Sequence, residues 1–191
     1  MHAARVRVAA APLSGPASGG WGAGQWVALL AVVLWGTLVG AARADNLPAP
    51  QGAVVLTVSG SIGRSNADGR AEFDLAMLRE LGVIRFATNT IWTDGVSTFE
   101  GVPLRAVLRA VEAAGPLVTA TALNDYSVTI PMAEVEAEAP IIAFLRDGRP
   151  MSVRDKGPLW VIYPYDDNPA YRTEMIYARS IWQLDRLRVH D

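Results

Sequence analysis

Residues 101–131 have the sequence GVPLRAVLRAVEAAGPLVTATALNDYSVTIP, and this stretch decides the fold class. Pro103 is favoured at the first position of a helix. Apolar side chains then recur at the spacing of one helix face, at Leu104, Val107, Leu108 and Val111. Gly115 is expected to end this helix. The first half of the stretch therefore predicts a short amphipathic helix.

The second half of the stretch predicts a β-hairpin. Residues 117–123 and 126–130 are rich in β-branched side chains, and Asn124-Asp125 between them is a typical turn sequence. Asp147-Gly148 is a second and stronger hairpin signal. The other expected strands are residues 53–59, 83–90, 141–146, 149–153, 159–163 and 181–189.

Helices are expected to be few and short. Asp74 can cap one that ends at Gly82, and residues 131–139 can hold a single turn. Several strands with few short helices indicate an α+β fold with a mixed or mostly antiparallel sheet. We expect residues 53–191 to form one domain, with residues 45–52 as a short tether.

The N-terminal segment has the organisation of a secretory leader. An apolar run from Trp26 to Val39 follows a basic start, and the small-x-small sequence Ala42-Arg43-Ala44 follows the run. The run is shorter than the roughly 20 residues of a membrane-spanning helix. We therefore expect a signal peptide over residues 1–44, cleavage after Ala44, and a periplasmic or secreted domain with no stable membrane insertion. An uncleaved membrane anchor is the alternative.

Composition excludes several classes of function. Removal of the leader deletes Arg5, Arg7 and Arg43 and moves the net charge from −2 to about −5. An acidic domain without a basic run is a poor match to nucleic acid or an anionic membrane. The chain has no Cys, and His190 is the only histidine beyond the leader. Disulfides, thiolate nucleophiles, soft metal sites and His-based triads are therefore excluded, and no metal ligand is assigned.

Five short motifs occur in order between about Val54 and Val189. They are Gly101-Val102-Pro103-Leu104-Arg105, Asn124-Asp125-Tyr126 with Ile130-Pro131, Asp147-Gly148-Arg149-Pro150-Met151, Arg154 to Val161, and Ser180-Ile181-Trp182. Together they resemble motifs of the oxidoreductase molybdopterin-binding domain family. The resemblance implies the sulfite-oxidase-like fold and, as the family cofactor, a molybdenum–pterin.

The chain departs from this family at the metal ligand. Family enzymes hold molybdenum through a cysteine thiolate after a strand that corresponds here to Val83 to Ala87, where this chain has Thr88-Asn89-Thr90-Ile91-Trp92. A threonine hydroxyl cannot replace a thiolate as a soft ligand. The leader also has no Arg-Arg pair, the mark of the export route for folded, cofactor-loaded proteins. We therefore expect no cofactor, and enzymatic activity is disfavoured.

Eight residues are candidates for ligand binding in the corresponding cleft: Thr88, Asn89, Trp92, Asn124, Asp125, Tyr126, Arg154 and Lys156. Residues 88–95 fit either a ligand-binding loop or an ordinary hairpin that turns at Asp94-Gly95 and has Trp92 in the core. The Asn124-Asp125 pair also fits a plain turn. No catalytic residue is assigned. Trp160 and Trp182 are expected in the core.

The sequence RDKGP at residues 154–158 contains Lys156, the only lysine of the chain. Two cations beside a glycine that exposes backbone N–H groups suit an anionic group. A solvated loop with an Arg–Asp pair is the alternative. Residues 163–169, YPYDDNP, fit a rigid rim loop or an oxygen-only calcium site. Residues 171–179 either complete the rim or form a surface helix.

Two functions from different classes remain. The favoured one is an exported, non-catalytic domain that binds a small anionic or heteroaromatic ligand, or a membrane sensor protein, in the former molybdopterin cleft. The alternative is a periplasmic molybdopterin-dependent oxidoreductase with non-cysteine metal ligation.

Overall fold

A computed structural model describes residues 46–136 and 140–191 of the chain. The expected signal peptide and the first residue of the expected tether lie outside the described residues. No helix in the described part of the chain is long and apolar enough to cross a membrane.

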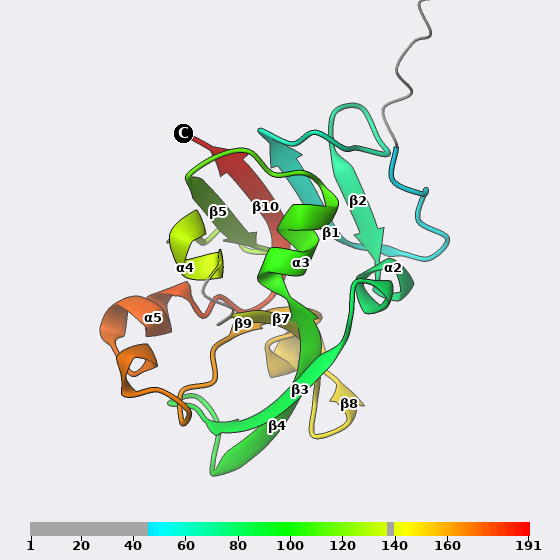
Figure 1. Cartoon of the computed structure of the whole chain (residues 1–191). Helices are drawn as coiled ribbons and strands as arrows, with labels where there is room; N and C mark the ends of the chain where they lie inside the picture. Colours follow the sequence, from blue (N-terminus) through cyan, green and yellow to red (C-terminus); the bar gives the residue numbers. More distant parts are fainter. Residues whose placement is uncertain (1–45, 137–139) are drawn as a thin grey trace, which may run out of the picture. The chain divides into compact units, whose positions relative to one another are not determined.

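The described residues form two sheets, and the first has the strand order β2-β1-β10-β5-β6 (Figure 1). Its strands are β1 (Val54–Gly60), β2 (Ala71–Asp74), β5 (Leu117–Ala122), β6 (Ser127–Pro131) and β10 (Leu184–His190). β1 and β10 pair in parallel, and the other neighbours pair antiparallel. Alternate residues of β5 are buried, as expected of a strand with one face on the core.

The second sheet has the order β3-β4-β7-β8, and β9 also pairs with β7, at residues 141–143. Its strands are β3 (Ile84–Asn89), β4 (Val96–Pro103), β7 (Ile141–Arg146), β8 (Arg149–Pro150) and β9 (Trp160–Ile162). All its pairings are antiparallel. Asp147 and Gly148 join β7 to β8 with φ angles of 52° and 76°, which is the backbone that a two-residue hairpin of this type requires.

The helices are short and connect strands. They are α2 (Leu75–Glu80), α3 (Leu104–Ala110), α4 (Met132–Glu136) and α5 (Glu174–Arg179), with 3-10 turns η1 (Val153–Asp155) and η2 (Pro169–Tyr171). The Asp74 side chain accepts a hydrogen bond from the Met77 backbone N–H and caps α2 as expected. The expected α+β class, with mostly antiparallel sheets and few short helices, is confirmed.

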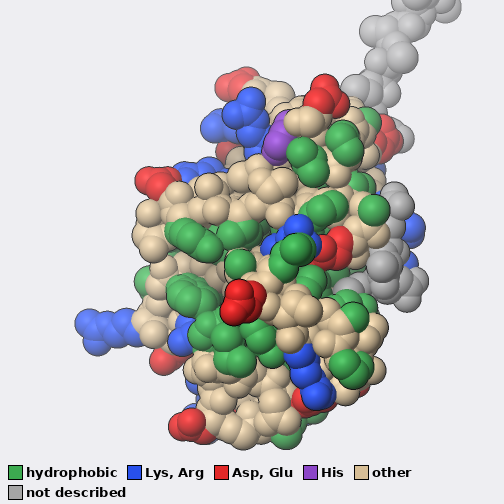
Figure 2. All heavy atoms as spheres, turned by 90° about the vertical axis from the view of Figure 1, so that its left-hand side faces the viewer, with side chains coloured by type: hydrophobic (Ala, Val, Ile, Leu, Met, Phe, Trp, Pro, Cys, Tyr) green, Lys and Arg blue, Asp and Glu red, His purple; other side chains and the backbone are tan. Residues whose placement is uncertain are grey.

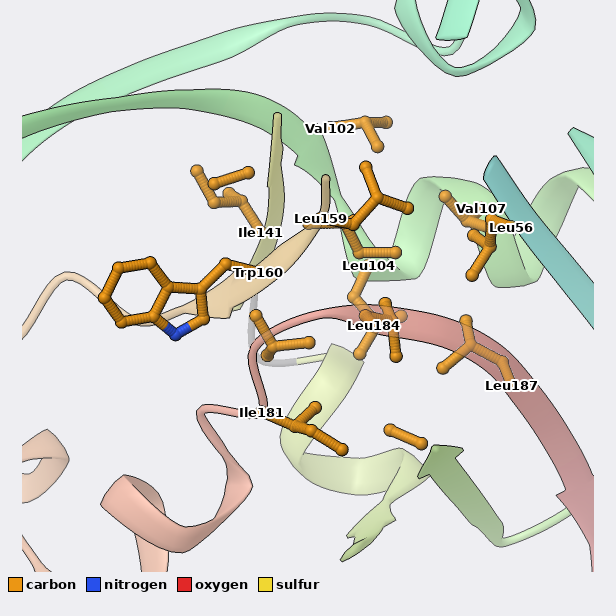
Figure 3. Packing of buried hydrophobic residues seen from close by; sticks show 14 of the residues in the cluster. Leu56, Val102, Leu104, Val107, Ile141, Leu159, Trp160, Ile181, Leu184 and Leu187 are labelled. Atoms are coloured by element: carbon orange, nitrogen blue, oxygen red, sulfur yellow. The ribbon is translucent and has the colours of Figure 1, made fainter. Parts of the chain in front are cut away.

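The apolar face of α3 packs where the two sheets meet. Figure 3 shows Leu104 directed towards Leu159 and Leu184, with Val107 beside Leu56. All of these side chains are fully buried. The apolar face predicted from the spacing of residues 104–111 is therefore the face of α3 that packs in the core. This face lies against strands of both sheets.

Some local expectations were wrong. Pro103 precedes α3 as its N-cap, and the helix ends at Ala110 because Glu112 takes the left-handed conformation with φ 52°. Gly115 has a different role: a Cβ there would lie 2.8 Å from the His190 carbonyl oxygen, so it permits close approach of β10. The strand β2 was not expected, and β4 was implied only by the hairpin alternative for residues 88–95.

The described part of the expected tether packs on the domain. Leu47 is buried, and the Asn66 side-chain amide donates to the Pro48 carbonyl at 2.7 Å. The Asp74 carboxylate accepts from the backbone N–H groups of Gln51 and Gly52 at 2.8 and 2.7 Å. The bond from the Met77 backbone N–H lowers the pKa of Asp74 most, and the bonds from Gly52 and Gln51 add to this effect. The pKa of Asp74 therefore lies below its ordinary value.

Candidate functional site

A cavity of about 470 Å³ lies where the β5–β6 turn, the β3–β4 turn and the segment from α5 to β10 meet. We call this cavity the aromatic pocket. It is lined by Ile91, Trp92, Ala122, Asn124, Tyr126, Tyr177, Ala178, Ser180, Ile181 and Trp182. Ile91, Tyr126 and Trp182 remain 62%, 54% and 38% exposed. The pocket is therefore apolar in its walls and open to solvent at its rim.

Trp92 is central to the walls of the aromatic pocket. Its ring meets those of Trp160, Tyr177 and Trp182 edge to face, with centroid distances of 5.7, 5.7 and 5.9 Å. The local turn is closed by a 3.1 Å bond from the Trp92 backbone N–H to the Thr90 hydroxyl. The hairpin interpretation of residues 88–95 is thus confirmed for the backbone, although residues 90–95 form the turn instead of Asp94-Gly95 alone. The Trp92 side chain both packs on the core and lines the pocket.

The β5–β6 turn contributes Asn124 and Tyr126 to the aromatic pocket. The Asn124 side-chain oxygen accepts from the Tyr126 backbone N–H at 3.2 Å, and Asp125 has φ 63°. The Asp125 carboxylate forms an exposed ion pair with Arg186 instead of lining the pocket. Of the three candidates on this turn, the structure therefore brings two to the pocket.

Thr88 and Asn89 do not line the aromatic pocket. The buried Thr88 hydroxyl accepts from the Asp166 backbone N–H at 3.1 Å and donates to the Asn89 carbonyl. The Asn89 backbone and side-chain N–H groups donate to the Asp166 carboxylate at 2.7 and 2.9 Å. Both side chains are therefore used to hold the β9–α5 loop against the end of β3.

The loop at residues 152–158 does not offer an open anion cradle. The Gly157 N–H donates to the Ser152 carbonyl at 2.8 Å, and the Asp155 carboxylate accepts from the Ser152 hydroxyl at 2.6 Å. Arg154 is exposed and does not line the aromatic pocket. The Lys156 ammonium, in contrast, lies over the Trp182 ring at 5.6 Å from its centroid and so adjoins a pocket wall.

A hydrogen-bonded network holds α5, whose last residues line the aromatic pocket. Glu134 of α4 pairs with Arg179 and accepts from the Tyr163 hydroxyl at 2.7 Å. Burial, followed by this bond to Glu134, raises the pKa of Tyr163. Burial likewise raises the pKa of Tyr165, whose hydroxyl lies 2.5 Å from the Ser180 hydroxyl. Both phenols therefore stay protonated and serve as hydrogen-bonding groups.

Sequence reasoning missed most of the pocket walls. Trp160 is fully buried as expected, but Trp182 was wrongly assigned to the core, because its ring closes the pocket at the surface. Tyr177 lies on α5, within the segment for which rim and surface-helix interpretations were both open. The spacing of Tyr177 and Trp182 was the one signal available in the sequence, but ordinary core segments have the same spacing.

Hydrophobic side chains also gather on the surface that carries α4 and α5. Figure 2 looks onto the side of the molecule that carries α4 and α5, and hydrophobic side chains form several patches there.

In the described residues, no three His, Asp or Glu side chains are grouped to hold a metal ion. Asp166 and Asn168 of the YPYDDNP loop are engaged with Asn89 and with the Ala170 backbone N–H.

Comparison with known proteins gives no assignment. Neither the family models nor the curated proteins contain a match to this chain.

Proposed function

We propose that this chain is an exported, non-catalytic domain of the sulfite-oxidase-like fold that binds a small anionic or heteroaromatic ligand. The aromatic pocket is the observation that carries the proposal. Ligand sites are typically concave and apolar, with a few polar groups that orient the ligand. Trp92, Tyr126 and Trp182 supply flat apolar surface, and the Asn124 side chain supplies a polar group.

The residues after β3 do not fit the molybdenum of the resembled family. The chain contains no cysteine. Thr88, the first residue of the corresponding TNTIW segment, lies in β3 and is fully buried, and its hydroxyl bonds to the backbones of Asp166 and Asn89. Molybdenum ligation would need a soft donor that this loop lacks. This misfit favours a binding function over the family's oxidoreductase chemistry.

The proposal is tested by the binding of indole, a neutral planar heteroaromatic probe. Wild type should bind it, and Tyr126→Ala should weaken binding by about 2–10-fold, since an aromatic contact contributes roughly 0.5–1.5 kcal/mol. Tyr126 is more than half exposed, so its removal should change the free energy of unfolding by less than about 0.5 kcal/mol. Isothermal titration calorimetry and urea denaturation measure the two quantities.

Met175→Ala is the matched control, because Met175 is equally exposed and lies outside the pocket lining. It should leave indole binding unchanged. No binding of indole by wild type, or equal binding by Tyr126→Ala, would contradict the proposal. Near-stoichiometric molybdenum in protein exported by a molybdenum-replete host would favour the oxidoreductase instead.

A further inference from the structure

Lys156 places a positive charge beside the aromatic pocket. Its ammonium lies 5.8 Å from the Trp160 ring centroid and 5.6 Å from that of Trp182, within the range of a cation–π contact. Among the described residues the ammonium has no hydrogen bond and no ion pair. The side chain is half-buried. The ammonium is thus held against a pocket wall without an anionic partner among the described residues.

The backbone at Lys156 is unusual for a lysine. Its φ of 72° lies in the left-handed region, which glycine adopts without strain and a residue with a Cβ does not. Gln183, with φ 54°, donates its backbone N–H to the Lys156 carbonyl at 3.0 Å, and its side chain donates to Val153 at 2.8 Å. Two left-handed residues therefore brace each other next to Trp182. Strained backbone that tertiary contacts maintain in this way is a feature of ligand sites.

We propose that Lys156 selects planar aromatic carboxylates as the ligands of the aromatic pocket. The ring packs against Trp182 and Tyr126, and the carboxylate accepts a charge-assisted hydrogen bond from the Lys156 ammonium. This inference rests on the proposed function and adds the ligand class to it.

A carboxylate fits better than a phosphate for two reasons. Among the described residues, Lys156 is the cation whose charge lies over a ring of the pocket lining, that of Trp182, and one point charge matches a monoanion. Phosphate sites usually add a cradle of backbone N–H groups, whereas the Gly157 N–H is already donated to Ser152. Because the Gly157 N–H is already used, the anion-binding group at this loop is the Lys156 side chain.

The test compares indole with indole-3-carboxylate by calorimetry at low salt. Wild type should bind the carboxylate roughly tenfold or more tightly than indole, the usual effect of a hydrogen bond to a charged group. Lys156→Gln should abolish this preference while indole affinity stays the same, and Lys156→Arg should keep part of it. Lys156→Gly should also lose the preference, yet unfold no more easily than wild type, because glycine accepts the left-handed backbone.

Arg149→Gln is the matched control, since it removes one exposed positive charge outside the pocket lining and should leave the preference intact. Equal binding of indole and indole-3-carboxylate by wild type would overturn the selection by Lys156 and leave the proposed function standing. Binding of neither compound would overturn the proposed function itself. Tighter binding of indoxyl phosphate than of the carboxylate would overturn the ligand class.

Discussion

At the residue scale, Asp166 connects the end of β3 to the loop that precedes α5. Its carboxylate accepts from the Asn89 backbone and side-chain N–H groups and pairs with Arg172 at 3.0 Å. These partners favour the ionised form of Asp166, and the Asn89 backbone N–H has the largest effect. The pKa of Asp166 therefore lies below its ordinary value of 3.8. The polar atoms of Thr88 and Asn89 are therefore used for structure, whereas Trp92, farther along the chain, lines the aromatic pocket.

This arrangement predicts a pH effect on stability. A carboxyl group whose pKa is depressed by folding stabilises the protein fully above its unfolded-state pKa, and the contribution is lost as pH falls through the folded-state pKa. Asp166→Asn should therefore lower the free energy of unfolding at pH 7 and make it fall less steeply between about pH 5 and pH 2. Urea denaturation at several pH values across this range measures the free energy of unfolding. Asp167→Asn is the control, and a slope equal to that of wild type in Asp166→Asn would refute the assignment.

At the element scale, α5 is too short to be stable alone, so its position depends on tertiary contacts. Arg179 at its end pairs with Glu134 of α4, and the two side chains are only 17% and 20% exposed. Arg179 also donates to the Thr129 carbonyl of β6 at 3.2 Å. Because Tyr177 and Ala178 precede Arg179 directly, this pair sets one wall of the aromatic pocket.

Arg179→Ala should lower the free energy of unfolding by about 1.5–3 kcal/mol, since a partly buried carboxylate loses its charged partner. It should also weaken indole binding, because the Tyr177 wall is no longer held. Glu174→Ala is the matched control, an exposed charge removed from the first turn of α5, with an expected loss below about 1 kcal/mol. Chemical denaturation and calorimetry give both readouts. Equal losses in the two variants would show that the Arg179–Glu134 pair does not position α5.

At the scale of the whole molecule, the two sheets are joined through the segments that flank the aromatic pocket. Val161 of β9 donates to the Ile181 carbonyl, and the Leu184 N–H of β10 donates to the Leu159 carbonyl, each at 2.9 Å. The pocket therefore lies at a junction that exists only when both sheets have formed. Leu47 belongs to the same core and lies only a few residues after the expected cleavage site at Ala44.

Export is predicted to yield a mature chain that starts at Asp45. Cleavage after Ala44 keeps Leu47 and the bonds of residues 48–52 to the domain, so the mature chain should be as stable as the described structure. Mass spectrometry of the exported protein measures the N-terminus. Ala44→Gln should leave an uncleaved precursor, because the cleavage site needs small residues. An intact Met1 in exported wild-type protein would contradict the signal peptide.

Local patterns in the sequence were sufficient for the fold class and for most elements. The helix face from Leu104 to Val111, the cap at Asp74 and the turn at Asp147-Gly148 each depend on residues a few positions apart. The short strand β2 escaped prediction because four residues, AEFD, carry too little periodicity. The absence of cysteine, and with it the exclusion of thiolate chemistry, was likewise determined by the sequence alone.

Only the tertiary structure decided which side chains form the pocket. Thr57 of β1 faces Arg186 of β10 across a parallel ladder, and no local pattern encodes such a distant pairing. The same long-range packing engages Asn89 with Asp166 and leaves Trp182 at the surface beside Lys156. A tryptophan or an amide has the same local signature in a core, a turn or a ligand site. Its role follows from which distant groups satisfy it, and those groups meet only in the folded chain.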